Sequence, residues 1–99
     1  MTPEGKVKAQ VKRTLDAIGA YHFMPATGGY GRSGIPDFVG CLNGVFFAIE
    51  CKANGGRPTA LQLREIDRIN GAGGFATVVD EHTVAVLESQ LKLLGRRQV

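Results

Sequence analysis

Apolar residues recur at helical spacing in the first part of the chain. Thr2 can cap the helix, Pro3 suits its first position, and Gly19 ends it. The apolar positions are Val7, Val11, Leu15 and Ile18. Because positions three and four residues apart share one helix face, the pattern predicts an amphipathic helix over residues 3–18.

The next segments have the composition of β-strands. Residues 20–24 favour a short strand, and the glycine-rich residues 26–34 favour a loop. Two apolar runs follow, IPDFVGC (35–41) and VFFAIECK (45–52), with Asn43-Gly44 between them. Asn-Gly between apolar runs favours a two-residue turn, so the sequence predicts a tight hairpin.

The second half of the chain returns to helical spacing before one more strand. Thr59 and Gln62 match a capping box that opens a helix. FATVV (75–79) is typical of a buried strand. A last helix is expected over residues 84–94, with a strand over residues 83–87 as the alternative.

These elements predict an α/β fold with the order α-β-β-β-α-β-α. The helix that begins after Thr59 can cross over so that the strand at 75–79 runs parallel to the strand at 45–52. The hairpin strands are antiparallel, so the sheet should be mixed. We therefore expect a central mixed β-sheet flanked by helices.

Size and composition fit one domain, residues 1–99. The chain has 99 residues, of which 43% are hydrophobic and 21% charged, as in ordinary globular domains. No apolar run approaches the ~20 residues that span a bilayer, and the N-terminus lacks the apolar core of a signal peptide. We expect a cytoplasmic protein without membrane association. Cys41 and Cys51 are too few for a disulfide framework and are expected to be buried thiols.

Basic residues cluster although the net charge is only +3. The clusters are Lys6, Lys8, Lys12 and Arg13; Arg57, Arg64 and Arg68; and Lys92, Arg96 and Arg97. They favour a polyanionic partner, with Lys6 and Arg57 as candidate DNA contacts, whereas the alternative is that they solvate helix faces. Composition does not decide between these two interpretations.

The hairpin register brings the most informative charges together. A two-residue turn pairs Leu42 with Val45, and further outward the same register pairs Asp37 with Glu50. Opposed residues share a face with Cβ atoms ~4.5–5.5 Å apart, and Lys52 shares that face. Three charged side chains are therefore expected on one face of the sheet.

Two opposed carboxylates destabilise a sheet unless something neutralises them. Mg²⁺ or Mn²⁺ could do so, and the backbone carbonyl of Cys51 could add an oxygen ligand. Such an ion would assist phosphodiester hydrolysis, while Lys52 could orient the attacking water or stabilise charge. The alternative is that Asp37 closes a turn and that Glu50 forms a surface ion pair. The register and the burial pattern together favour the metal site.

Glu4 and Gln62 are weaker candidates for the same site. Glu4 faces the apolar side of its helix, so it could reach the metal site as a ligand or as support for a water, whereas the helix dipole also explains its position. Gln62 faces the same side as Ile66 and Ile69. It could hold a water or the scissile phosphate, or turn back toward Thr59 in the capping box.

The glycine-rich loop offers candidate contacts rather than a nucleotide site. Tyr30, Arg32 and Ser33 could stack on or contact nucleic acid, or they could belong to a simple connector. The segment lacks the Gly-Lys-Ser/Thr ending of a P-loop, so ATP hydrolysis is not predicted. His22 and His82 have no ligand spacing to the cysteines, so zinc is not predicted.

Three motifs, GIPD (34–37), IECK (49–52) and TALQL (59–63), resemble those of the PD-(D/E)xK nucleases. More narrowly, they resemble the virus-type replication-repair nuclease (VRR-NUC) domain. The resemblance covers nearly the whole chain and implies a restriction-endonuclease-like fold. It also implies Asp37 and Glu50 as metal ligands, Lys52 as the catalytic lysine, Gln62 as the motif glutamine and Glu4 as the acid of the N-terminal helix. Some related nucleases carry a tyrosine at the position of Glu65.

The resemblance implies a Mg²⁺- or Mn²⁺-dependent DNA endonuclease that acts on branched DNA, such as a Holliday junction or a flap. It further implies a homodimer, whose symmetry matches that of a four-way junction. A phage source would fit, and the protein would then work in the host cytoplasm. Two alternatives stay open, a non-catalytic DNA-binding module and an exonuclease of the same superfamily.

Overall fold

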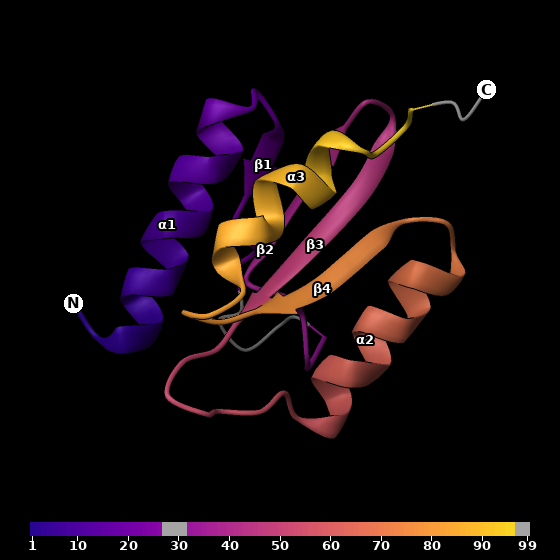
Figure 1. Cartoon of the computed structure of the whole chain (residues 1–99). Helices are drawn as coiled ribbons and strands as arrows, with labels where there is room; N and C mark the ends of the chain where they lie inside the picture. The colour runs from indigo at the N-terminus through magenta and orange to yellow at the C-terminus, as the bar shows by residue number, and fades with distance from the viewer. Residues whose placement is uncertain (27–31, 97–99) are drawn as a thin grey trace.

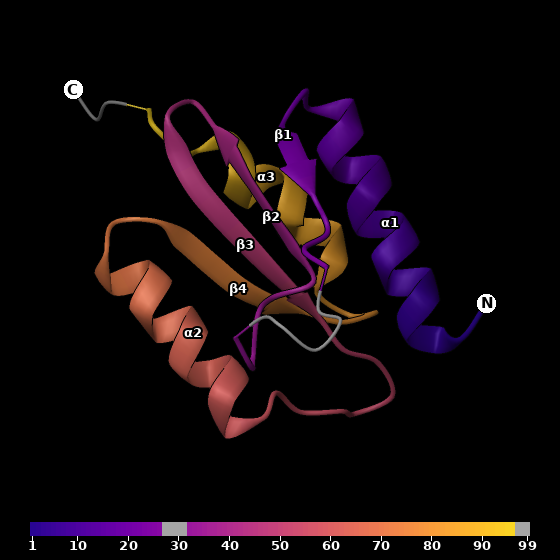
Figure 2. The same cartoon turned by 180° about the vertical axis from the view of Figure 1, so that it is seen from behind.

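The computed structural model describes residues 1–26 and 32–96, which form a four-stranded sheet with helices on both faces (Figures 1 and 2). The order of elements is the predicted one. The elements are α1 (Pro3–Ala17), β1 (Tyr21–Phe23), β2 (Phe38–Leu42), β3 (Val45–Cys51), α2 (Ala60–Gly71), β4 (Phe75–Val79), a short 3₁₀ helix η1 (Val84–Val86) and α3 (Leu87–Lys92).

The sheet is mixed, with strand order β1-β2-β3-β4. β1, β2 and β3 are antiparallel neighbours, and β4 runs parallel to β3. α2 is the crossover that connects the two parallel strands, as expected for strands that a tight turn cannot join. The predicted parallel pairing is therefore confirmed.

The β2–β3 hairpin has the predicted register. Leu42 lies opposite Val45, and the pairing continues to Phe38 opposite Ile49. The turn residue Asn43 has φ 52°, and Gly44 after it has φ 80°, which are the positive values that a two-residue turn of this kind requires. The register thus sets which residues follow at the open end of the hairpin, beyond Phe38.

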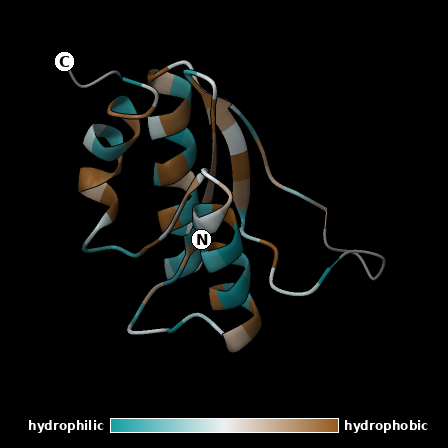
Figure 3. Ribbon diagram, turned by 90° about the vertical axis from the view of Figure 1, so that its right-hand side faces the viewer, coloured by the Kyte–Doolittle hydropathy of each residue, from teal (hydrophilic) through white to brown (hydrophobic). Residues whose placement is uncertain are grey.

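Side chains alternate between two apolar layers. On one face, α1, η1 and α3 pack against β3 residues that include Phe47, Ile49 and Cys51. On the other face, Ile66 of α2 packs against Ala48 and its neighbours in β2 and β4. Both apolar and polar residues appear around each helix in Figure 3, which fits amphipathic helices that cover a sheet. β3, paired on both sides and covered on both faces, is the centre of the fold.

Both long helices begin as the sequence predicts. Thr2 accepts a hydrogen bond from the N–H of Gly5, with Pro3 at the start of α1. Thr59 caps α2 through a full capping box with Gln62. None of the helices in the described ranges combines the length and apolar character needed to cross a membrane.

Three details differ from the sequence-based expectations. β2 begins at Phe38 rather than at residue 35, because Pro36 has no N–H for the ladder and the segment before Phe38 bends away from β3. The alternative strand at residues 83–87 is wrong, since the chain there forms η1 and enters α3. Cys41 is exposed, whereas Cys51 is buried as expected.

Gly40 permits a close approach inside the sheet. A Cβ atom at this position would lie 1.9 Å from the carbonyl oxygen of Tyr21 and 2.6 Å from Cζ of Phe47. Both neighbours are fixed, Tyr21 by its backbone in β1 and Phe47 by full burial in the core. The ring of Phe47 thus occupies the space that a side chain at Gly40 would take.

Gly40→Ala should lower the free energy of unfolding by about 1–3 kcal/mol, the usual range for overpacking a core. Urea denaturation measures this change. Gly71→Ala is the matched control, because a Cβ at the exposed end of α2 meets nothing within 4 Å. It should leave stability unchanged or raise it slightly. Equal losses in both variants would contradict the role given to Phe47.

Candidate active site

Asp37 stands where β2 separates from β3. Its Oδ2 accepts a hydrogen bond of 2.8 Å from the backbone N–H of Cys51. The side chain thereby replaces the main-chain acceptor that β2 would have supplied had the ladder continued. The hydrogen bond fixes the carboxylate at the open end of the hairpin, next to Glu50 in the register.

Glu50 is a buried carboxylate near the end of β3, with 3% of the residue exposed. Its Oε2 accepts a hydrogen bond of 3.0 Å from Nε2 of Gln62 and lies 3.3 Å from Nζ of Lys52. Its Oε1 is buried and has no hydrogen-bond partner, the one such side-chain atom in residues 1–26 and 32–96. One oxygen of Glu50 is therefore held in place while the other is unsatisfied.

The environment of Glu50 opposes its ionisation. Burial, and then the negative charge of Asp37, raise the pKa of Glu50 to about 7, although Lys52 acts in the opposite direction. An unpartnered carboxylate oxygen in such a place costs free energy unless a cation or a proton meets it. The charged form of Glu50 is thus less favourable than that of an exposed carboxylate.

Lys8 of α1 reaches the site from the other side of Asp37. Its Nζ lies 3.6 Å from Oδ1 of Asp37 and 3.5 Å from Oε2 of Glu4. Burial lowers the pKa of Lys8, but the charges of Asp37 and Glu4 outweigh this effect and raise it overall. Lys8 therefore stays protonated and connects α1 to the carboxylate of Asp37.

Glu4 lies at the rim rather than in the centre of this group. Its side chain is 43% exposed, and its contact with the site runs through Lys8. Its charge still contributes to the raised pKa of Glu50. The structure places Glu4 in the first turn of α1 and within the electrostatic reach of the site, where both sequence interpretations of Glu4 put it.

Gln62 has the capping-box role that the sequence offered, and it also contacts Glu50. Its Oε1 accepts the N–H of Thr59 at 2.8 Å, which completes the capping box, and its Nε2 donates to Glu50. The two ends of one amide therefore tie the start of α2 to β3. Near this contact, Gly34 packs on the first turn of α2 with φ +83°, and a Cβ there would lie 2.5 Å from the carbonyl oxygen of Leu61.

These residues fit an oxygen-liganded cation. Two adjacent carboxylates, one of them buried with an unpartnered oxygen and a raised pKa, are what a hard divalent cation would satisfy. The carbonyl of Cys51 points to the same edge as its N–H, toward Asp37, because both groups of an extended residue face one neighbouring strand. Burial, then Asp37, raise the pKa of the Cys51 thiol to about 12, so its sulfur stays protonated in the core.

The site does not hold a larger cluster of ligating side chains. No group of three or more His, Cys, Asp or Glu side chains with metal-binding geometry occurs in the part of the chain that the structure describes. A cation here would therefore take Asp37, Glu50 and the Cys51 carbonyl, with water or substrate oxygens as further ligands, as Mg²⁺ usually does.

The candidate DNA contacts are spread over the surface. Arg32 pairs with Glu65 of α2 at 2.8 Å, and Ser33 is exposed in the turn beside it. Arg57 is exposed in the loop between β3 and α2. Lys6 lies away from the carboxylates, in a hollow of about 330 Å³ beside Asn54 and Glu81. Tyr30 lies outside the described residues.

Sequence reasoning missed two features of this region. Lys8 was counted only as part of a basic cluster, although its spacing of four residues from Glu4 could have indicated a contact between them. The buried Glu65, with 5% of the residue exposed, has two arginine partners and was noted only for its place after Gln62. No sequence pattern signals its partner Arg32, which is 33 residues away.

Comparison with known proteins agrees with this fold. A solved structure described as a VRR_NUC domain superposes on the chain with a TM-score of 0.70 and 30% sequence identity. The match covers 99% of this chain and 100% of the other. The fold and its arrangement of elements are those of a VRR-NUC domain. This chain belongs to that family, which confirms the resemblance found in its motifs.

A curated relative comes from Acyrthosiphon pisum secondary endosymbiont phage 1, where it is named "Putative nuclease p44". It is 44% identical over 72 residues, which are 72% of this chain. The matched region spans 64% of the phage protein. No protein-family model matches the chain.

Replacing Glu50 should reveal the cost of its buried charge. Below its ordinary pKa of 4.5, Glu50 is neutral in both the folded and the unfolded chain and costs no stability. As the pH rises from 4.5 to about 7, the unfolded chain ionises first, so the fold loses stability; above about pH 7 this loss is complete. In EDTA, Glu50→Gln should therefore be more stable than the wild type at about pH 8, by on the order of 2–3 kcal/mol at most, and similar to it near pH 4.

Urea unfolding at the two pH values measures this difference. Glu88→Gln is the control, because Glu88 is an exposed glutamate of α3 with its own lysine partner, Lys92. Its effect should be small and should not grow with pH in this direction. A Glu50→Gln variant that is less stable than the wild type at about pH 8 would contradict the cost assigned to the buried charge of Glu50.

Proposed function

We propose that this protein is a Mg²⁺- or Mn²⁺-dependent DNA endonuclease that hydrolyses phosphodiester bonds in branched DNA. The observation that carries the proposal is the unpartnered, buried Oε1 of Glu50 beside Asp37. Membership of the VRR-NUC family and a phage relative named as a nuclease support the reaction class.

In this proposal the ion is held by Asp37, Glu50 and the backbone carbonyl of Cys51. When bound, it supplies charge neutralisation at the phosphate and lowers the pKa of a coordinated water. Gln62 keeps one oxygen of Glu50 occupied, so the other faces the ligand position. Two neighbours hold the Asp37 carboxylate: the N–H of Cys51 donates a hydrogen bond to it, and Lys8 forms an ion pair with it.

Lys52 is the residue of the chain best suited to act on the reacting phosphate. Its ammonium is anchored 3.3 Å from Oε2 of Glu50, and its side chain is 17% exposed. A lysine fixed in this way can orient the attacking water or stabilise negative charge that develops on the phosphate. Glu4 acts less directly, by holding Lys8 at the rim of the site.

The DNA backbone would contact basic and polar residues at several places on the surface. The proposed contacts are Arg32, Ser33, Tyr30, Arg57 and Lys6. Such contacts position a duplex through its phosphates without reading sequence. Their scatter over several elements suits a substrate that approaches from more than one direction, as the arms of a branched DNA do.

Asp37→Asn should abolish cleavage, with a loss of at least ~100-fold, while DNA binding in EDTA stays close to that of the wild type. Lys52→Met should also lose on the order of 100-fold without changing the metal requirement. The assay uses labelled four-way junctions, flaps and plain duplex with Mg²⁺, Mn²⁺ or EDTA. Asp67→Asn, an exposed carboxylate of α2, is the matched control and should cut normally.

Three results would count against this proposal. If the wild type binds DNA but cuts nothing with either metal, the chain is a catalytically silent DNA-binding module. Digestion that proceeds from DNA ends would indicate an exonuclease of the same superfamily. Cleavage that continues in EDTA would remove the role given to Asp37 and Glu50.

We also propose that the protein works as a homodimer. β1 is an edge strand, with open backbone groups that can pair with another strand. It exposes Tyr21 to 70% and Phe23 to 51%, and the adjacent Met24 to 50%. Clustered exposed apolar side chains of this kind are typical of an interaction surface.

Phe23→Lys should shift the protein from dimer toward monomer in sedimentation equilibrium, because it places a charge in this apolar surface. Leu93→Lys is the control, since Leu93 is 68% exposed but lies at the end of α3. The assignment of the interface to β1 fails if both variants remain dimeric or if both dissociate.

A further inference from the structure

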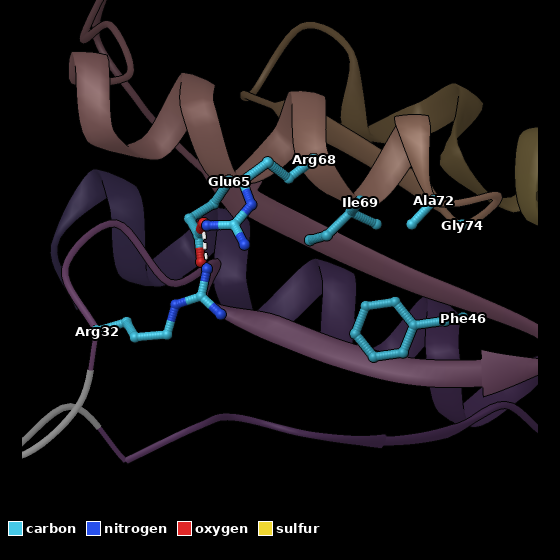
Figure 4. A pocket seen from close by; sticks show the side chains of 7 residues that line it. All are labelled: Arg32, Phe46, Glu65, Arg68, Ile69, Ala72 and Gly74. Carbon is cyan, nitrogen blue, oxygen red and sulfur yellow. Dashed lines mark hydrogen bonds and ion pairs between the residues drawn. The ribbon is translucent and has the colours of Figure 1, made fainter.

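A groove runs between α2 and β3 on the sheet face that also carries Glu50. It has a volume of about 410 Å³, within the range of ~300–1,000 Å³ that small ligands occupy. Figure 4 shows Arg32 and Arg68 near Glu65 at one end, Phe46 toward the other, and Ile69 along α2 between them. The groove is therefore cationic at one end and apolar at the other.

The cationic end is built on one buried carboxylate. Glu65 has a side chain only 6% exposed, and its Oε2 lies 2.8 Å from Nη2 of Arg32 and 3.7 Å from Nη1 of Arg68. The two arginine side chains remain 59% and 61% exposed. One buried carboxylate thus holds two guanidinium groups, which leaves one net positive charge and most of their N–H donors facing the groove or solvent.

This arrangement suits a phosphate. Arginines already paired with one carboxylate lose less further freedom when they bind an anion, and their planar forks match phosphate oxygens. A purely structural role would require only one cation to neutralise Glu65. The second arginine is therefore available for a ligand.

The apolar end suits the flat face of a base. Phe46 is 47% exposed, although it lies in the central strand of the fold. Aromatic side chains beside arginines stack unpaired bases of single strands. In a duplex the base faces are already stacked on one another, so Phe46 would have no partner there.

The groove lies on the same sheet face as Glu50, with Ile66 packed on Ala48 between Phe46 and Glu50. Phe46 and Glu50 are four residues apart on the same face of β3, which is about 13 Å. On α2, Gln62 and Glu65 are three residues apart and thus neighbours on one helix face. Gln62 holds Glu50, and Glu65 holds the arginines. A strand bound at Glu50 would therefore need to span about four nucleotides, at ~3.4 Å per stacked nucleotide, to bring a base to Phe46.

We propose that this groove binds an unpaired nucleotide of the substrate strand, with its base against Phe46 and its phosphate between Arg32 and Arg68. The inference rests on the proposed function and narrows its substrate. A branched DNA with a single-stranded arm fills the groove, whereas plain duplex and a fully paired four-way junction leave it empty.

The test is equilibrium binding in EDTA, so that no cleavage is needed. The probes are a fluorescent oligothymidylate, a flap, a duplex and a paired four-way junction. Phe46→Leu keeps an apolar side chain but removes the aromatic face, and it should weaken binding of the oligothymidylate and the flap about tenfold. Binding of the duplex and the junction should not change. Phe46→Trp should retain the wild-type affinities.

A second variant tests the cationic end. Arg68→Gln should lower the salt dependence of flap binding by about one phosphate contact. Arg64→Gln is the matched control, because Arg64 is an exposed arginine of the same helix that does not line the groove. Equal changes in the two variants would mean that Arg68 acts only through general charge.

The outcomes separate this inference from the proposed function. If Phe46→Leu binds each of the four probes as tightly as the wild type does, the groove proposal is overturned, even if the protein cuts DNA. So does a Phe46→Leu variant that changes the oligomeric state, which would assign Phe46 to contact between copies of the chain. Selective loss for the unpaired probes supports the groove, even if no DNA is cut with metal.

Discussion

The buried carboxylate of Glu50 is the constraint on which the rest of the site depends. It lies in the central strand, beside a second carboxylate, and its pKa is raised by burial and then by Asp37. The surrounding protein compensates only one of its two oxygens, since Gln62 and Lys52 both approach Oε2 and leave Oε1 without a partner. A sequence selected only for stability would place an apolar residue here, as in the preceding positions of β3. A cation bound at Oε1 would offset the free-energy cost of burying this carboxylate.

This constraint explains why the parts of the fold converge at one end of β3. The hairpin turn sets the register that brings Asp37 to Glu50, and the end of the β2 ladder frees the Asp37 side chain to take the N–H of Cys51. α1 contributes Lys8 from the opposite side, and α2 contributes Gln62 from its first turn. Each helix is held by its own cap, so these side chains are positioned by regular elements rather than by loops.

Local sequence signals made most of the fold and of the candidate site predictable. The helix caps, the Asn-Gly turn and the continuous apolar run of β3 each depend on near neighbours, and all were confirmed. The position of Asp37 beside Glu50 followed as well, because a two-residue turn fixes every later pair of the hairpin. The contacts that sequence could not supply join distant segments without a periodic pattern, such as Lys8 with Asp37 and Arg32 with Glu65. The exposure of Cys41 was missed because its side chain lies on the same sheet face as Val39, where α2 packs mainly against β3 and β4.

α2 joins the two proposed binding regions through one rigid element. Its first turn holds Glu50 through Gln62, and its next turn holds Arg32 through Glu65. Because a helix transmits position with little distortion, any shift of α2 against β3 would move the Glu50 contact and the arginine pair together. Arg32 also belongs to the segment that leads to Asp37, so the same ion pair ties that segment to α2. The geometry at the carboxylates and the occupancy of the groove are therefore mechanically coupled, which is the arrangement expected if strand recognition and hydrolysis are to occur on one bound strand.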